Sequence, residues 1–362
     1  MVNAFALSKF ITQIISALVI IAENTSCSVF VRVDFPISAE KIVSSLVLYE
    51  PCNIINRIAK KQTYLMRKIL TCGYSSRQPF KLMRMPDENG LDKVEAMKHT
   101  YYKLKLECLV ILGGNGSQKT ANLLREEGLN IVSLPKTIDN DLWGSDLTFG
   151  FHSAVDVATN AIDCIHTTAA SHGRVFIVEI MGHKVGWLAL YAGIAGGADI
   201  ILLPEIPYDI DVVVNAIRSR TKNGKNFTIL AVAEGAISKE NAALTKKELK
   251  EKKKNGPVYP SVAYELGAQI SERTGQEIRV TVPGHMQRGG EPCPYDRVIA
   301  TRLGAEAAEM IRRKEYGYMV ALNNNKIEKI PLADIAGKLK MVDPKSDIIR
   351  EAKDVGISFG DE

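Results

Sequence analysis

The first 72 residues contain no glycine, although the chain of 362 residues contains 27. At the average usage of about 7%, roughly five glycines would be expected there. This absence excludes from the segment any glycine-rich loop of the kind that lets a backbone approach a phosphate group closely. Glycine recurs throughout the chain from Gly73 onward, so such loops are expected only there.

Cysteine pairs with CxxC or zinc-binding spacing are also absent. Scattered thiols fit a reducing compartment better than a disulfide framework, so we predict a cytoplasmic protein. The apolar stretch at 5–22 contains Lys9 and Gln13, follows no basic region and precedes no clear cleavage site. We interpret it as a buried or irregular segment and expect no membrane partner. The cysteines are Cys27, Cys52, Cys72, Cys108, Cys164 and Cys293.

The net charge of +5 is too small to indicate a nucleic-acid-binding protein, although a modest positive field favours anionic substrates. A hydrophobic content of 46% and a charged content of 24% are typical of soluble globular proteins. The length is sufficient for two domains of about 100–200 residues each.

From about residue 105, short apolar runs alternate with longer helical patterns. Such alternation indicates βαβ units and a parallel sheet with both faces covered. The expected strands are 107–112, 129–134, 174–180, 199–205 and 227–235, and the expected helices are 117–128, 152–170, 185–197 and 211–224. Because ligands bind at the carboxyl ends of such strands, the loops that follow them are the candidate sites: "GGNGS", "PKTIDND", "MGHK" and "AEGA".

The first of these loops places Gly113, Gly114 and Gly116 between a strand and a helix that opens near Ser117. Backbone N–H groups and the positive end of a helix can bind phosphate at such a turn. The loop lacks both the GxGxxG and the GK[ST] spacing, and an ordinary tight turn is the alternative.

The second loop offers a base and a metal ligand together. If the stretch is extended, Asp139 and Asp141 point the same way and Asn140 points the opposite way. One carboxylate could then accept a proton from a hydroxyl while the other holds Mg²⁺. The alternative is an Asx turn that caps the following helix.

A third stretch, "RVTVPGHMQRGG", places Arg279, His285 and Arg288 together. Arginine suits bidentate recognition of phosphate, so we interpret this stretch as part of an anion site.

The motifs "GGNGS", "PKTIDND", "VEIMGH", "AEG" and "RVTVPGHMQRGGEPCPYDR", in this order, resemble the 6-phosphofructokinase family over about residues 75–340. NAD kinases and lipid kinases share a similar glycine loop but lack the partner motifs. The resemblance implies an α/β fold of two doubly wound, mostly parallel-sheet domains with the active site between them. The implied nucleotide domain is 73–149 with 287–337, and the implied sugar-phosphate domain is 150–286 with 338–362.

The resemblance also implies a glycolytic kinase that transfers a phosphoryl group from ATP to the 1-hydroxyl of fructose 6-phosphate. Asp139 resembles the general base, Thr137 would lie beside the sugar and the transferred group, and Asp141 would lie near Mg²⁺. The implied sugar-phosphate ligands are Arg174, Arg279, His285 and Arg288, and the implied sugar contacts are Met181, Gly182 and Glu234. In this family some of these ligands come from a neighbouring subunit, usually of a homotetramer. The residues implied to hold the donor phosphates are Arg77, Gly113, Gly114, Gly116 and Ser117.

Several positions depart from the family pattern. Asn115 replaces an aspartate that helps to hold Mg²⁺, and an amide binds a hard cation less strongly than a carboxylate does. His183, in the substrate site, replaces an arginine. Asp199 and Lys225 resemble members of the family's allosteric effector site, but His166 and Asn223 replace two of its basic residues. These replacements argue against allosteric control.

The family's opening strand and "GGDxxGLN"-like loop have no counterpart in the glycine-free residues 1–72. We interpret this atypical segment as foreign or frame-shifted, with the first strand missing or improvised. A catalytically impaired subunit is therefore one alternative function.

A pyrophosphate-dependent enzyme is the other alternative. Pyrophosphate users of the family carry an aspartate at the position of Gly116, and glycine leaves room for the α-phosphate of ATP. Lys136, which precedes "TIDND", occurs in pyrophosphate users and in some ATP users. Because the room at Gly116 is steric and a lysine is adaptable, we expect ATP as the donor.

Overall fold

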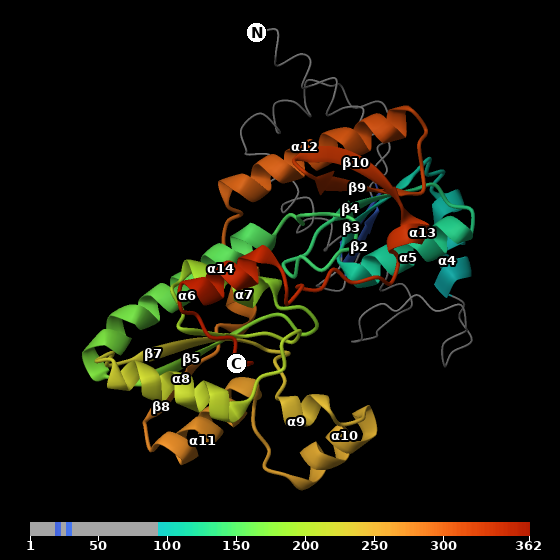
Figure 1. Cartoon of the computed structure of the whole chain (residues 1–362). Coiled ribbons are helices and arrows are strands. Elements are labelled where there is room, and N and C mark those ends of the chain that lie inside the picture. Colours follow the sequence, from blue (N-terminus) through green and yellow to red (C-terminus); the bar gives the residue numbers. More distant parts are fainter. Residues whose placement is uncertain (1–18, 23–26, 31–92) are drawn as a thin grey trace, which may run out of the picture. The chain divides into compact units, whose positions relative to one another are not determined.

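The computed structural model describes residues 19–22, 27–30 and 93–362, and Figure 1 labels their helices and strands. The chain divides into two compact units. Unit 1 contains the described residues up to Thr137 together with Leu142–Phe149 and Pro294–Leu339. Unit 2 contains Ile138–Asp141, Gly150–Cys293 and Lys340–Glu362. Most of the glycine-free segment, including most of the apolar stretch, lies outside the described residues, as does Arg77.

Unit 1 is built on a mixed sheet in the order β10-β9-β4-β3-β1-β2. The neighbours β1, β3, β4 and β9 run parallel, and the two outer strands β2 and β10 are antiparallel to their partners. The strands are β1 (Val19–Ala22), β2 (Cys27–Phe30), β3 (Leu109–Gly113), β4 (Ile131–Pro135), β9 (Tyr318–Asn323) and β10 (Lys326–Pro331). Among the described residues, β1 pairs with β3 in this sheet. β1 comes from the glycine-free segment, in which the family's first strand is predicted to be missing or improvised.

Helices cover both faces of this sheet because alternate strand residues point to opposite sides. Leu109 and Ile111 of β3 pack in a cluster with α4, α5 and α13, whereas Val110 and Leu112 pack in another with α12. Every residue of β3 and β4 is buried, as expected for parallel strands covered on both sides. The helices are α4 (Lys93–Lys103), α5 (Asn115–Glu126), α12 (Pro294–Arg312) and α13 (Leu332–Ile335).

Unit 2 contains a fully parallel sheet in the order β6-β7-β5-β8. The strands are β5 (Val175–Ile180), β6 (Ile200–Leu202), β7 (Thr228–Ala233) and β8 (Ile278–Thr281). The helices are α6 (Phe151–His172), α7 (Trp187–Ala195), α8 (Ile210–Lys222), α9 (Lys239–Ala242), α10 (Lys246–Asn255), α11 (Val262–Thr274) and α14 (Asp347–Asp354), with a 3₁₀ turn η1 (Gly284–Arg288). Among the described helices, none has the length and apolar character needed to cross a membrane.

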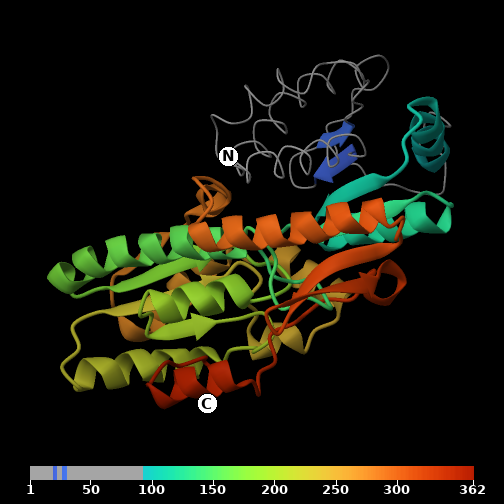
Figure 2. The same ribbon diagram turned by 90° about the horizontal axis from the view of Figure 1, so that it is seen from above.

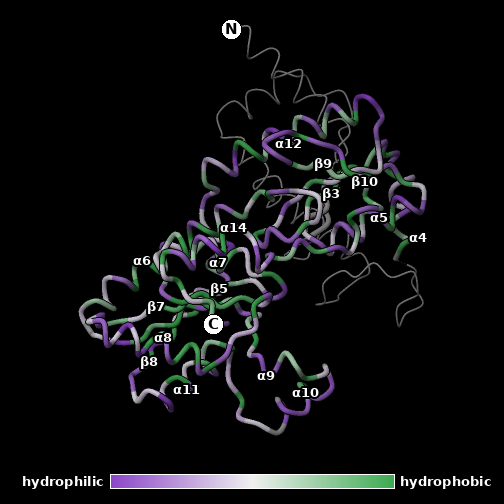
Figure 3. The backbone as a smooth tube through the Cα atoms, in the orientation of Figure 1, coloured by the Kyte–Doolittle hydropathy of each residue, from purple (hydrophilic) through white to green (hydrophobic). Residues whose placement is uncertain are grey.

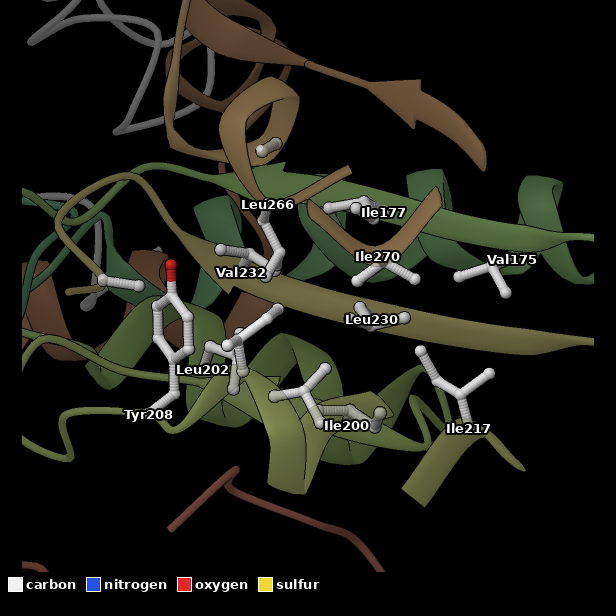
Figure 4. Packing of buried hydrophobic residues seen from close by; sticks show 14 of the residues in the cluster. Val175, Ile177, Ile200, Leu202, Tyr208, Ile217, Leu230, Val232, Leu266 and Ile270 are labelled. Carbon is white, nitrogen blue, oxygen red and sulfur yellow. The ribbon is translucent and has the colours of Figure 1, made fainter. Parts of the chain in front are cut away.

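The core of unit 2 forms where α8 and α11 pack against one face of the sheet. Figure 4 shows Ile217 of α8 and Ile270 of α11 beside the side chains of Val175 and Leu230 from the strands. Helices α6 and α7 contact the sheet strands as well, and α6 is the long green helix of Figure 2. The hydrophobic colour of β5 in Figure 3 reflects a strand whose six residues are all buried.

The predicted alternation of strands and helices is confirmed in the range 107–235. The strands are shorter than predicted, and the largest difference is in β6, which ends at Leu202 rather than at residue 205. Pro204 lacks the N–H group that would continue a ladder, and the chain turns there between Leu203 and Ile206.

Candidate active site

The glycine loop of unit 1 connects β3 to α5. Gly114 is the N-cap of α5, and a Cβ at this position would lie 3.4 Å from Cβ of Thr137. The loop therefore packs closely against the chain that leaves β4. Ser117 is buried in the first turn of α5, whereas Gly116 is exposed there. Because the first N–H groups of a helix have no intrahelical acceptor, this turn can bind an anion.

Asn115 makes a contact that an aspartate could not make. Its Nδ2 atom donates a hydrogen bond to the carbonyl oxygen of Lys338, at 2.8 Å. A carboxylate in this position would have no hydrogen to donate. The nitrogen of the amide thus holds residue 338 in unit 1, and only the oxygen could serve as a cation ligand.

Thr137 and Lys136 follow β4 directly. Thr137 is buried, and its carbonyl oxygen accepts a hydrogen bond from Oγ1 of Thr148 at 2.9 Å. The backbone N–H of Lys136 donates to the carbonyl oxygen of Gly113 at 3.2 Å. The carboxyl ends of β3 and β4 are therefore joined, and they bring the glycine loop, Lys136 and Thr137 together within unit 1.

The acidic loop in unit 2 is not extended. Asn140 has a φ of 51°, in the left-handed region, so the condition under which Asp139 and Asp141 would point the same way is not met. Asparagine tolerates this conformation better than most residues because its short side chain can form local hydrogen bonds. The turn buries Asn140 and leaves Asp139 half-buried.

Asp141 has a buried carboxyl group whose pKa is raised. Its side chain is buried, and among the described residues its Oδ1 atom has no hydrogen-bond partner. Burial, and next the charge of Asp139, raise the pKa of Asp141 to about 6, whereas Lys340 and Lys184 act in the opposite direction. A buried carboxylate oxygen without a hydrogen bond, beside a second carboxylate, suits an oxygen-seeking divalent cation. No cluster of three or more histidine, cysteine or acidic side chains surrounds a metal position in the described part of the chain.

The loops after β5 and β7 are in direct backbone contact. The N–H of Gly235 donates to the carbonyl oxygen of Gly182 at 3.2 Å, and Gly182 has a φ of 137°. A Cβ added to Gly235 would lie only 2.1 Å from the carbonyl oxygen of His183. The two glycines therefore allow Met181, His183 and Glu234 to occupy one edge of the sheet.

Gln287 joins a third loop to this edge, although it is not among the site residues predicted from the sequence. Its side chain is fully buried; Oε1 accepts from the N–H of Met181 at 3.1 Å, and Nε2 donates to the carbonyl oxygen of Gly284 at 3.2 Å. His285 and Arg288 flank this residue and are exposed. The only signal in the sequence was the position of an amide between two predicted anion ligands.

Arg174 and Arg279 lie elsewhere in unit 2. Arg174 precedes β5, whereas Met181 follows it, and a strand of this length separates the two by about 20 Å at ~3.3 Å per residue. Glu277 forms ion pairs with both arginines, through Nε of Arg174 at 2.6 Å and through Nη2 of Arg279. The structure therefore groups the predicted sugar-phosphate ligands of one chain into two sets.

The residues that resemble an effector site are largely engaged within unit 2. Asp199 forms a 2.7 Å ion pair with Arg220 through one oxygen and accepts from the N–H of Ile229 through the other. Nε2 of His166 lies 2.9 Å from the carbonyl oxygen of Gly196. Asn223 is the C-cap of α8, and Lys225 is exposed.

Comparisons with known proteins agree with the resemblance of the motifs. The family model described as Phosphofructokinase matches residues 71–311. An ATP-dependent 6-phosphofructokinase of Spirochaeta thermophila is 54% identical over 295 residues, which cover 80% of this chain and 79% of that protein. ATP-dependent 6-phosphofructokinase 3 of Bacteroides thetaiotaomicron is 44% identical over 288 residues, which cover 80% of each.

A solved structure supports the fold. The crystal structure of Pichia pastoris phosphofructokinase in the T-state superposes with a TM-score of 0.58 and 32% identity. The match covers 68% of this chain and 28% of that one. The predicted fold class and the resemblance of the motifs are thereby confirmed, and this chain belongs to the phosphofructokinase family.

Proposed function

We propose that this chain is an ATP-dependent 6-phosphofructokinase, which transfers the γ-phosphoryl group of ATP to the 1-hydroxyl of fructose 6-phosphate. The product is fructose 1,6-bisphosphate. The observation that carries the proposal is 54% identity to a relative of that name over 80% of the chain. Steady-state formation of the bisphosphate by the purified chain, measured with ATP and with pyrophosphate, tests it. If no bisphosphate forms with either donor, the result would favour a catalytically impaired subunit.

In this reaction Asp139 accepts the proton of the 1-hydroxyl as its oxygen attacks the γ-phosphorus. A half-buried carboxylate is suited to this role because its oxygen atoms remain accessible to a substrate that enters from solvent. Thr137 lies beside the transferred group. Phosphoryl transfer depends mainly on positioning and on neutralisation of charge, which loops fixed at strand ends provide.

Unit 1 is proposed to bind the phosphoryl donor. Gly113, Gly114, Gly116 and Ser117 would contact the donor phosphates at the N-terminus of α5, and Lys136 would add a cation beside them. Asp141, which belongs to unit 2, would hold Mg²⁺. When bound, this ion neutralises charge on the donor phosphates.

Unit 2 is proposed to bind the sugar phosphate. Met181, Gly182, His183 and Glu234 would contact the sugar, and His285 with Arg288 would bind the phosphate. Arg174 and Arg279, which are grouped around Glu277, would serve a site of a neighbouring subunit. This division supports a homo-oligomer, and we propose a homotetramer with shared active sites in the cytoplasm.

The Arg279→Ala variant should raise KM for fructose 6-phosphate at least tenfold and leave KM for the donor nearly unchanged. The reason is the loss of a charge-assisted hydrogen bond, which is worth ~1.5–3 kcal/mol. Initial-rate kinetics with each substrate varied in turn measure the change. The control is Arg350→Ala, which removes another exposed arginine that forms ion pairs on α14. A shift in the KM of the donor alone would contradict the assignment.

Mixed oligomers test whether Arg279 acts across subunits. Chains with Arg279→Ala retain Asp139, and chains with Asp139→Asn retain Arg279. If each site takes Arg279 from a neighbour, co-assembly of the two variants restores complete sites that have the parental KM for fructose 6-phosphate. If each site uses its own Arg279, the mixture contains no site with the parental KM.

The donor can be tested by Gly116→Asp. The new carboxylate should abolish ATP use, because it crowds and repels the α-phosphate at the first turn of α5. The assay is kcat/KM with ATP and with pyrophosphate at equal concentrations. As a control, Gly304→Asp adds the same group to α12, where a Cβ meets nothing within 4 Å. Continued ATP turnover in Gly116→Asp would refute the assigned position of the loop.

A further inference from the structure

The chain segment that enters α14 is fixed beside the acidic loop in unit 2. The N–H of Lys340 donates to the carbonyl oxygen of Asp141 at 2.9 Å, and Nε1 of Trp187 donates to the carbonyl oxygen of Lys340 at 2.8 Å. Two residues later, the N–H of Val342 donates to Glu205 at 3.0 Å. The backbone of Lys340 is therefore held on both sides by other elements of the same unit.

The side chain of Lys340 points back to the acidic loop. Its Nζ atom donates to Oδ1 of Asn140 at 3.0 Å and lies 5.5 Å from the centroid of the Trp187 ring. A cation over an indole face is attracted by the electron density of the ring. The ammonium group is thus directed at the Asn140 amide by the backbone contacts and by the indole together.

Asn140 is the residue through which such a contact would affect the reaction. It lies between Asp139 and Asp141, is buried, and has the left-handed φ of 51°. If Asn140 returned to a common conformation, both neighbouring carboxylates would turn with the backbone. A hydrogen bond from a charged donor stabilises the amide in its present place.

We propose that Lys340 is a positioning residue of the phosphoryl-transfer site, which holds Asn140 and thereby fixes the direction of the Asp139 carboxylate. This inference rests on the proposed function of Asp139. Lys340 itself touches no reacting atom in this role. Trp187 supports it by fixing both the carbonyl group and the ammonium group of the lysine.

The first test is the Lys340→Gln variant, which removes the charge and shortens the side chain. We expect kcat for bisphosphate formation to fall about 10²-fold, a loss that a misplacement of about 1 Å can cause, while KM for fructose 6-phosphate stays within threefold. Lys340→Arg should recover most of kcat, because a guanidinium can also stack on the indole and donate to the amide. Lys345→Gln, which changes an exposed lysine of the same segment, should leave both constants unchanged.

The second test does not depend on activity. Amide hydrogen exchange at Asp139, Asn140 and Asp141 should be faster in Lys340→Gln than in the parent chain or in Lys345→Gln, since the loop loses a restraint. Unchanged exchange would overturn the inference even if the chain has no turnover. If the parent chain turns over and Lys340→Gln has the same kcat, the positioning role of Lys340 is overturned, whereas the proposed function remains supported. If Lys340→Gln does not fold, the same two measurements are made on Lys340→Met, which also removes the charge, and unchanged exchange or a parental kcat in that variant would overturn the inference.

Discussion

The Asp139→Asn variant should lose about 10²–10⁴-fold in kcat, the range expected when a general base is removed. The substitution keeps the shape of the side chain but removes its ability to accept the proton of the sugar hydroxyl. Binding of fructose 6-phosphate should be largely retained, because the proposed phosphate ligands are untouched. Initial rates at saturating donor, together with the KM for the sugar, measure the two effects separately.

A matched control is Asp163→Asn, which makes the same change at an exposed position of α6. Its kcat should equal that of the parent chain. If Asp139→Asn stays within threefold of the parental kcat, Asp139 is not the base. A loss of sugar binding with a normal kcat would instead indicate that Asp139 contacts the substrate without accepting a proton.

The Gly235→Ala variant should be almost as damaging, although it adds only one methyl group. The new Cβ would lie 2.1 Å from the carbonyl oxygen of His183 and 3.0 Å from that of Gly182. Both obstacles are backbone atoms, so one of the two loops must move as a whole. A displacement of about 1 Å at a reacting site can cost about 10²-fold in rate, and we expect at least this loss in kcat/KM for fructose 6-phosphate.

The control for this change is Gly304→Ala. Gly304 lies within α12, has open space around its Cβ position and has no positive φ. Alanine should therefore preserve activity there and raise the melting temperature slightly, because alanine favours helix more than glycine does. A Gly235→Ala chain with parental kcat/KM would mean that the two loops separate without consequence for the site.

The framework of the fold could be predicted from the sequence because it depends on local patterns. The runs at 174–180 and 227–235 are apolar without alternation, and both became fully buried parallel strands. Since ligands bind at the carboxyl ends of parallel strands, the loops that contain Met181 and Glu234 are predicted as candidate sites, and the structure places their backbones in contact.

Features that depend on distant partners could not be predicted in this way. The left-handed turn at Asn140 accompanies a contact with Lys340, which is 200 positions away in the chain, and Gln287 reaches Met181 across 106 positions. The sequence predicts that Asn115 is a weak Mg²⁺ ligand. In the structure its Nδ2 atom donates a hydrogen bond to the carbonyl oxygen of Lys338. No local sequence pattern predicts such pairs, because each pair forms only when distant segments of one unit pack together.

Glu277 gives the two grouped arginines a further property. It is the counter-ion of both Arg174 and Arg279, so the free chain carries these guanidinium groups already neutralised in part. A phosphate ester that takes both arginines must therefore displace a carboxylate, and its binding becomes an exchange of one anion for another. A small carboxylate that cannot contact both guanidinium groups at once would gain little free energy from this exchange. Arg174 and Arg279 would therefore select a phosphate ester over small carboxylates by its charge and geometry.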